Sequence, residues 1–301
     1  MRTIFTWLGR LIVGLIILIA IVTAFIYVRS EQMLNQTFHA PEVAITVPTD
    51  AASIERGHHI TTVIADCTGC HGKDFSGGAV IDDPAIGRVV ALNLTKGKNG
   101  LGSVLSDDDF AHILRYGIKP DSHSVLVMPA TDFMHFSDTD LGAVIAYIKS
   151  LPPVDSNLPP TQLGPVGRVL LVAGQLPLVV ASRIDQSKVG GPDVPPAVSA
   201  EYGGYMASVS CAGCHGDGLS GGQIVGAPPS FPKAANLTPS GEVGSWTQAD
   251  FQKAVQTGVT PAGKTLDPFM PYQTFANLTN DEVQALWLYV HSVPARPAGT
   301  H

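Results

Sequence analysis

A twelve-residue word occurs twice in this chain of 301 residues and holds all four of its cysteines. It reads CTGCHGKDFSGG from Cys67 and CAGCHGDGLSGG from Cys211. Each copy places a histidine directly after a Cys-x-x-Cys pair. Because self-similarity at a fixed offset marks repeated structural units, the chain is predicted to hold the same small domain twice.

The repeat extends well beyond the two words. A shift of 143 residues superposes Asn93-Leu94-Thr95 on Asn236-Leu237-Thr238, and a shift of 142 superposes Met128-Pro129 on Met270-Pro271. Helix signals recur in the same order, with N-capping Ser or Thr, acidic first turns, apolar stripes and a glycine or proline stop. The N-caps are Ser106, Thr247, Ser137 and Thr279, and the stops are Gly117, Gly258, Pro152 and Pro294. Strand patterns are scarce, so the expected fold class is all-α.

The N-terminus carries a long apolar segment. Residues 11–28 contain no charge, and at about 1.5 Å per residue they span roughly 27 Å, close to the hydrocarbon core of a bilayer. The segment is predicted to be a membrane-spanning helix. A cleaved signal peptide is the alternative, although its apolar region would be shorter and would not run directly into Arg29. Arg2 and Arg10 precede the segment, so the positive-inside rule places the rest of the chain outside the cytoplasm.

A second apolar stretch, GPVGRVLLVAGQLPLVVAS, covers residues 164–182. Arg168, Gln175 and Pro177 interrupt it and leave uncharged parts too short to cross a bilayer. We expect a linker helix that lies on the domains or in the membrane interface. The expected organisation is an anchor over 1–31, a tether over 32–49, an all-α domain over 50–155, a linker with an apolar interfacial helix over 156–194, and a second all-α domain over 195–301.

The repeated Cys-x-x-Cys-His word is the attachment signature of c-type haem. The two thiols add to the vinyl groups of the porphyrin, and the adjacent imidazole becomes an axial ligand of the iron. The residues concerned are Cys67, Cys70 and His71 in the first copy and Cys211, Cys214 and His215 in the second. Zinc would need the cysteine pairs closer together, a thioredoxin-like pair would need a βαβ context, and disulfides would not explain the repeated histidine. Two covalently bound haem c groups are therefore expected.

The opposite axial ligand is inferred from the repeat. Met128 and Met270 are superposed, and each precedes a proline, which favours an extended backbone suited to a loop that carries a thioether across the far face of a haem. Both are predicted to be iron ligands rather than core residues. Alternatives in the first copy that lack a counterpart in the second are Met134, His112 and His123. The other unmatched histidines, interpreted as ordinary polar residues, are His39, His58, His59 and His135.

The two Asn-Leu-Thr segments formally match a glycosylation sequon. Their recurrence at one place in the repeat favours a structural loop beside each haem. Asn and Thr side chains in such a loop could bond either to local backbone or to a haem propionate.

With these motifs in place, the chain resembles class I cytochrome c domains. The second copy, GSWTQADFQKAVQTGVTPAGKTLDPFMPYQTFANLTNDEVQALWLYVHSVP, is similar to the haem domains in the cytochrome subunits of membrane-bound alcohol, gluconate and aldehyde dehydrogenases. The resemblance covers both domains and implies two tandem class I cytochrome c domains that transfer single electrons. Subunits of that family usually carry three haem domains, whereas this chain has two attachment words.

These features favour a membrane-tethered dihaem cytochrome c that carries electrons from a quinol or dehydrogenase to an oxidase or soluble cytochrome, as a subunit of a respiratory complex. The expected partners are redox proteins, namely a dehydrogenase, a quinol-oxidising complex or a terminal oxidase. The formal net charge of −7 and the lack of a basic cluster argue against nucleic acid. The expected location is the bacterial inner membrane, with a single span and the haem domains on the periplasmic side.

A dihaem redox enzyme of the peroxidase or thiosulfate dehydrogenase type is the alternative function. It would need one haem with an open or exchangeable axial position, and two matched Met-Pro loops argue for two closed ones. The sequence contains no evident triad, carboxylate pair or phosphate-binding loop, so substrate chemistry is expected to belong to a partner.

Overall fold

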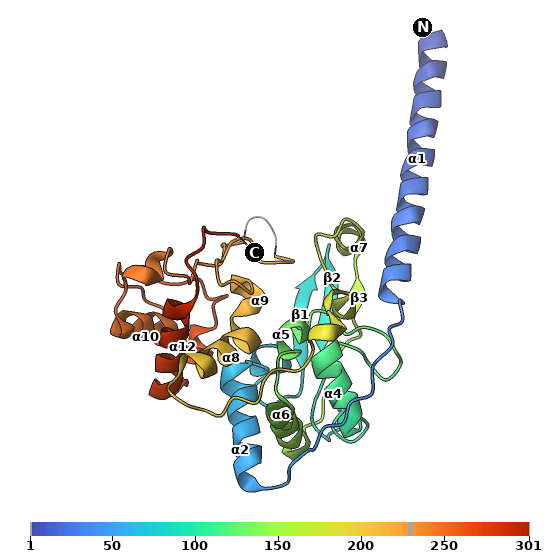
Figure 1. Cartoon of the computed structure of the whole chain (residues 1–301). Helices are drawn as coiled ribbons and strands as arrows, with labels where there is room; N and C mark the ends of the chain where they lie inside the picture. The colour runs from blue at the N-terminus through green and yellow to red at the C-terminus, as the bar shows by residue number, and fades with distance from the viewer. Residues whose placement is uncertain (1, 228–230, 301) are drawn as a thin grey trace.

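The computed structural model describes residues 2–227 and 231–300, and it consists of a long N-terminal helix and two helical domains that pack against each other (Figure 1). Helix α1 covers Arg2–Leu34. The first domain contains α2 (Ala51–His59), η1 (Ile60–Ile64), α3 (Thr68–His71), α4 (Asp107–Tyr116), α5 (Ala130–Phe133) and α6 (Asp138–Ser150). The connecting segment contains α7 (Pro165–Val172), η2 (Val180–Arg183) and η3 (Gln186–Lys188). The second domain contains α8 (Ala200–Ser210), α9 (Ala212–His215), η4 (Glu242–Ser245), α10 (Gln248–Thr257), α11 (Tyr272–Phe275) and α12 (Asn280–Ser292).

Each domain is built on a close crossing between its first and its closing helix, α2 with α6 and α8 with α12. A glycine lies at both crossings. A Cβ added to Gly57 would lie 2.0 Å from the carbonyl oxygen of Ala143, and one added to Gly203 would lie 2.0 Å from that of Ala285. The backbones therefore approach too closely for any side chain at these two points.

Helices α4 and α10 confirm the repeated capping signals. Ser106 with Asp109 and Thr247 with Asp250 form reciprocal capping boxes, which satisfy backbone N–H groups at the helix start. Both helices end at a glycine in the left-handed conformation, which a residue with a side chain adopts at a cost. The loop that leads to each Met-Pro pair therefore leaves its helix in the same direction.

The first helix differs between the domains where it approaches the cysteines. Ten positions separate Gly57 from Cys67, but only eight separate Gly203 from Cys211. The first domain accommodates the longer path in the π-helical turn η1, whereas α8 stays regular to Ser210. Such π-helical turns are often found near functional sites.

A small antiparallel sheet is the departure from a purely helical fold. Its strands are β1 (Gly78–Asp83), β2 (Gly87–Ala91) and β3 (Gln162–Leu163), in the order β1-β2-β3. A period-2 pattern does not reveal it because β1 has no buried residue, and the buried residues of β2 are the neighbours Val89 and Val90. In the described part of the corresponding stretch of the second domain, Gly222 and Ala234 form an isolated bridge.

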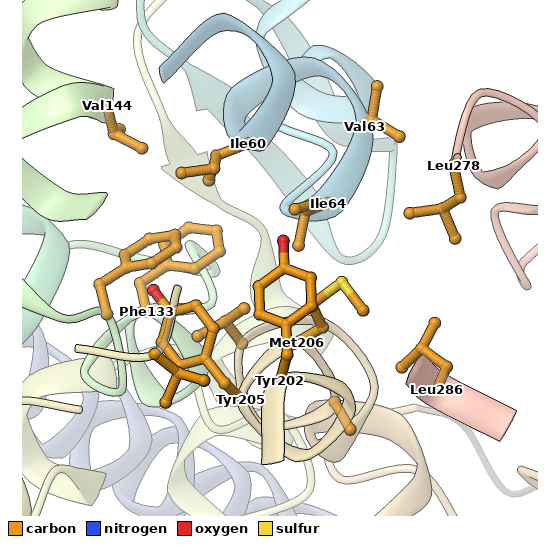
Figure 2. Close-up of a cluster of buried hydrophobic side chains, with 14 of the residues drawn as sticks. Ile60, Val63, Ile64, Phe133, Val144, Tyr202, Tyr205, Met206, Leu278 and Leu286 are labelled. Atoms are coloured by element: carbon orange, nitrogen blue, oxygen red, sulfur yellow. The ribbon is translucent and has the colours of Figure 1, made fainter. Parts of the chain in front are cut away.

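One hydrophobic core runs through both domains (Figure 2). Ile60 and Ile64 from the first domain and Tyr202 and Met206 from the second are buried members of it, with at most 3% of their surface exposed. Burial of apolar surface stabilises a contact by about 25 cal/mol per Å². We therefore expect the two domains to unfold together rather than as independent domains joined by a linker.

Polar contacts across this contact region follow the repeat. The carboxylates Asp140 and Glu282 are superposed by it, and each binds the first helix of the other domain. Tyr205 Oη donates to Asp140 Oδ2 at 2.7 Å, and His59 Nε2 lies 2.8 Å from Glu282 Oε1. The two domains therefore pack with quasi-two-fold symmetry.

Helix α1 is highly apolar, and its apolar face is exposed along most of its length. Its 33 residues correspond to about 50 Å. Among the described residues, α1 is the one helix long and apolar enough to cross a membrane. The apolar stretch 164–182 instead forms the short helix α7, the turn η2 and the loop between them.

The segment that follows α1, residues 35–49, lies along the first domain. The N–H of Phe38 donates to the carbonyl of Ser122 at 2.8 Å, and His112 Nε2 donates to the carbonyl of Pro41 at 2.8 Å. Further along, Val43 and Ile45 pack against the common core. The segment is therefore an outer layer of the first domain.

Candidate haem sites

Each domain encloses a cavity between its Cys-x-x-Cys-His turn and its Met-Pro loop. The first cavity has a volume of about 360 Å³, and the second has a volume of about 430 Å³. All the sequence-predicted site residues line them: Cys67, Cys70, His71 and Met128 the first, and Cys211, Cys214, His215 and Met270 the second. Most other lining side chains are apolar, as is usual for cofactor sites.

The cysteines lie at the start and within a single helical turn, α3 in the first domain and α9 in the second. All four thiols are free, and burial raises the pKa of each, to about 12 for Cys67 and Cys211. They therefore lack the thiolate character of a reactive redox pair. Within residues 2–227 and 231–300, no group of three or more His, Cys, Asp or Glu side chains could hold a metal ion.

The histidine of each word is oriented by the same hydrogen bond. His71 Nδ1 donates to the carbonyl of Leu92 at 2.7 Å, and His215 Nδ1 donates to the carbonyl of Ala235 at 2.8 Å. Burial lowers the pKa of both imidazoles, and the carbonyl partner opposes this effect. A neutral ring held through Nδ1 has its Nε2 available as a metal ligand.

The two methionines sit in equivalent loops. Pro129 and Pro271 both have φ near −78°, with ψ of 51° and 50°. In each loop the residue after proline donates its N–H back to the methionine carbonyl, at 2.8 Å for Met128 and 2.7 Å for Met270. This three-residue turn fixes the methionine backbone beside the cavity in the same way in both domains.

The backbone before the methionine differs. Val127 has a φ of +67°, and the N–H of Met128 donates to the carbonyl of Leu126 at 2.8 Å. A β-branched residue in this region is strained. In the second domain Phe269 has no positive φ, and the N–H of Met270 donates to Asp267 instead. The backbone before Met128 therefore forms a tighter and more strained turn than the backbone before Met270.

The alternative axial residues lie away from both cavity linings. Met134 is buried in a separate cluster with Val180 and Ile184. His112 bonds to the backbone of the segment after α1, and His123 pairs with Asp121 at 3.4 Å. Sequence reasoning missed the role of His59, which bonds across the domain contact. The available signal was that the repeat superposes His59 on Tyr205.

The Asn-Leu-Thr loops bond to local backbone. Asn93 Nδ2 donates to the carbonyl of Val154 at 2.7 Å, and Asn236 Nδ2 donates to that of Arg296 at 2.8 Å. The two carbonyls occupy the same place in the repeat, just after the closing helix. Asn93 is fully buried, so its recurrence is explained by a structural contact.

The two sites meet at the domain contact. The carboxylate of Asp132, which lies on α5 just after the first Met-Pro pair, packs against Gly213 within the second attachment turn. A Cβ on Gly213 would lie 2.2 Å from Asp132 Oδ2. Ile64 of the first domain lines the second cavity. In the reverse direction, Thr274 Oγ1 donates to Asp66 Oδ1, next to Cys67, at 3.1 Å.

The residues present fit haem c. Each cavity offers an apolar interior, a pair of neutral thiols on one turn, a neutral imidazole with Nε2 free, and a methionine from a separate loop. The helical fold and these paired sites define a tandem c-type cytochrome.

Comparisons with known proteins agree. Residues 52–148 match the family model of cytochrome c oxidase, cbb3-type, subunit III, and residues 201–294 match that of cytochrome c. The chain therefore contains two cytochrome c domains, which indicates haem c binding and a role in electron transfer.

The relatives of the chain are subunits of dehydrogenases. It is 29% identical over 278 residues to the fructose dehydrogenase cytochrome subunit of Gluconobacter japonicus, covering 83% of this chain and 55% of that protein. It is 31% identical over 134 residues to the cytochrome c subunit of alcohol dehydrogenase (quinone) from Gluconacetobacter polyoxogenes, covering 42% and 28%. It is 35% identical over 99 residues to the gluconate 2-dehydrogenase cytochrome c subunit of Pantoea cypripedii, covering 30% and 22%. The chain thus spans about half the length of the first relative and less than a third of the other two.

Proposed function

We propose that this chain is the electron-transfer subunit of a membrane-bound dehydrogenase and carries two covalently attached haem c groups. When bound, haem c supplies a one-electron Fe(II)/Fe(III) couple. Cys67, Cys70, Cys211 and Cys214 would form the thioether bonds, and His71 with Met128 and His215 with Met270 would hold the two irons. The chain itself would fix the positions of the ligands, exclude water from the two cavities and hold the two sites at a fixed position relative to each other.

One observation carries the proposal: two matched cavities, each with a complete ligand set, are joined through a common core. Asp132 packs closely against Gly213, so the loop after the first methionine contacts the second attachment turn. Ile64 extends from the first domain to the wall of the second cavity. A rigid, buried contact of this kind supports transfer of electrons between the two sites within one chain.

The donor we propose is a dehydrogenase that oxidises a sugar or an alcohol, because the relatives named above are cytochrome subunits of such enzymes. The proposed acceptor is an oxidase or a soluble cytochrome. Helix α1 would anchor the chain in the bacterial inner membrane, and Arg2 and Arg10 before its apolar run favour haem domains on the periplasmic side.

The test is to solubilise native membranes in a mild detergent, capture the full chain by an affinity tag and identify stoichiometric partners by mass spectrometry. A flavin- or quinone-dependent dehydrogenase, together with haem reduction on addition of its substrate, is the expected result. Recovery with an oxidase or a quinol-oxidising complex would replace the proposed donor. Recovery of the chain alone, with no substrate-dependent haem reduction in intact membranes, would refute a subunit role.

A dihaem enzyme is the second candidate, and the strained turn at Val127 is the observation that favours it. Strain next to an axial methionine lowers the cost of releasing it. Carbon monoxide added to the reduced native protein separates the two functions. A pure carrier leaves both haem spectra unchanged, whereas an enzyme of this type shows binding at the first haem.

A further inference from the structure

The short helix α7 is fixed to the end of α1 by a single buried arginine. Arg168, with 8% of its surface exposed, donates to Ser30 Oγ at 2.7 Å and to Glu31 Oε1 at 2.6 Å. Its guanidinium carbon lies 3.9 Å from the ring centroid of Tyr27, within the range of a cation–π interaction. Ser30 is fully buried by this contact. Helix α7 therefore keeps a fixed height along α1.

That height is the place where the apolar run of α1 ends. The run extends to Val28, and the charged residues Arg29 and Glu31 follow directly. Charged side chains at the end of a spanning helix mark the boundary between hydrocarbon and headgroups. An element held against Tyr27, Ser30 and Glu31 must lie at this boundary if α1 spans the membrane.

The side of α7 that faces away from the protein is apolar. Val166 and Val169 are 45% and 44% exposed, and Ala173 follows on the same face. The one charge of the helix, Arg168, is turned inward onto α1, and Leu171 on the inner side is buried in a second core cluster. Several exposed positions on other helices are polar, for example Asp108, Asp138 and Lys253.

Close packing on the inner side of α7 prevents the helix from rotating about its axis. A Cβ on Gly167 would lie 2.1 Å from the carbonyl oxygen of Ile86, at the end of the β1–β2 hairpin. The hairpin, α7 and the last turns of α1 share the core cluster that contains Val89 and Leu171, with Met33 and Leu34 packed against it. The exposed valines are therefore presented outward by a rigid support.

We infer that the outer face of α7, formed by Val166, Val169 and Ala173, is a lipid-binding surface that rests in the headgroup–acyl boundary of the membrane. The inference rests on the membrane anchoring proposed above. The proposed occupant is phospholipid. This face continues the apolar surface of α1, and a spanning α1 would itself be surrounded by lipid. An apolar helical face in this position is buried about 5–10 Å into the boundary.

The test uses three variants of the full chain, each with one cysteine added to the four of the attachment motifs, reconstituted into vesicles of phosphatidylethanolamine and phosphatidylglycerol. Val169→Cys probes α7, Leu18→Cys probes the middle of α1, and Ala52→Cys probes an exposed position on α2, at the opposite end of the molecule (Figure 1). The probe is a water-soluble maleimide polymer that shifts the chain on a gel. The unsubstituted chain gives the background, and labelling in denaturant shows that every thiol can react.

The expected result is labelling of Val169→Cys about tenfold or more slower than that of Ala52→Cys, and close to that of Leu18→Cys, since a thiol in an apolar phase is neither ionised nor reached by the reagent. Fast labelling at 169 with protection at 18 would overturn the lipid-binding surface and leave the anchor intact. Fast labelling at both would overturn the anchor as well. Protection at 169 in native membranes but not in lipid vesicles would assign the face to a protein partner.

Discussion

The two cytochrome c domains share almost every feature that holds a haem site together, and they differ in what surrounds it. Both have the glycine crossing, the capping boxes, the backbone-bonded histidine and the Met-Pro turn. The first domain adds a sheet, the segment 35–49 and α7 around its site. The described residues of the second domain form no such layers, and Phe269, next to its methionine, is 51% exposed. The ligand geometry has therefore been kept while the surroundings have changed.

The largest expected effect tests what the domains share. Gly57→Ala and Gly203→Ala each place a Cβ 2.0 Å from a carbonyl oxygen of the closing helix, so each should lower the free energy of unfolding by roughly 2–3 kcal/mol. Denaturant unfolding followed by circular dichroism measures this. Gly9→Ala, with nothing within 4 Å of its added Cβ, is the control and should be nearly neutral. A large decrease in the free energy of unfolding for one of the two variants, but not for the other, would show that the crossings are not equivalent.

The next effect tests where the domains differ at their contact. Burial raises the pKa of Asp132 from an ordinary 3.8 to about 7; Arg183 opposes the shift and Asp217 adds to it. Between these pH values the native state keeps a proton that the unfolded chain has lost. The free energy of unfolding should therefore fall as pH rises from about 4 to about 7.

Asp132→Asn removes the titrating group while keeping a side chain of nearly the same size next to Gly213. Its free energy of unfolding should depend less on pH in that interval than the parent's. Thr274→Ser, at the equivalent position of the second domain, leaves the pH dependence unchanged and serves as the matched control. Parallel pH profiles for Asp132→Asn and the parent would contradict the assignment.

The smallest effect concerns the methionine loops. Val127→Gly relieves a left-handed φ and should strengthen ligation by Met128, by about 1 kcal/mol, or roughly fivefold in the concentration of imidazole that displaces the methionine. Phe269→Gly has no such strain to relieve and should weaken ligation by Met270 slightly, through added loop flexibility. Spectroscopic imidazole titration of each variant measures both. Equal shifts in the same direction would remove the proposed difference between the two turns.

Sequence reasoning predicted the repeat, the helices, their caps and the eight candidate haem-site residues, because these depend on local sequence signals that occur in both copies. The structure places all eight in the walls of the two cavities. The sheet escaped it, since Val89 and Val90 are adjacent buried residues rather than alternating ones. The common core escaped it for a different reason. Tyr202 and Met206 look like the buried stripe of one small domain, and nothing local reveals that their partners include Ile60 and Ile64, more than a hundred residues away.

In the membrane arrangement proposed above, the segment 35–49 would determine how the haem domains meet a redox partner. A free chain of about 15 residues would let the domains wander through a radius of roughly 20 Å, and encounters would then depend on local concentration rather than on orientation. With Phe38 and Pro41 bonded to the first domain, that search is absent. With α1 in the bilayer as proposed, its rotation about its own axis would decide which face of the domains a partner meets, and productive encounters would depend on lateral diffusion and rotation within the membrane plane.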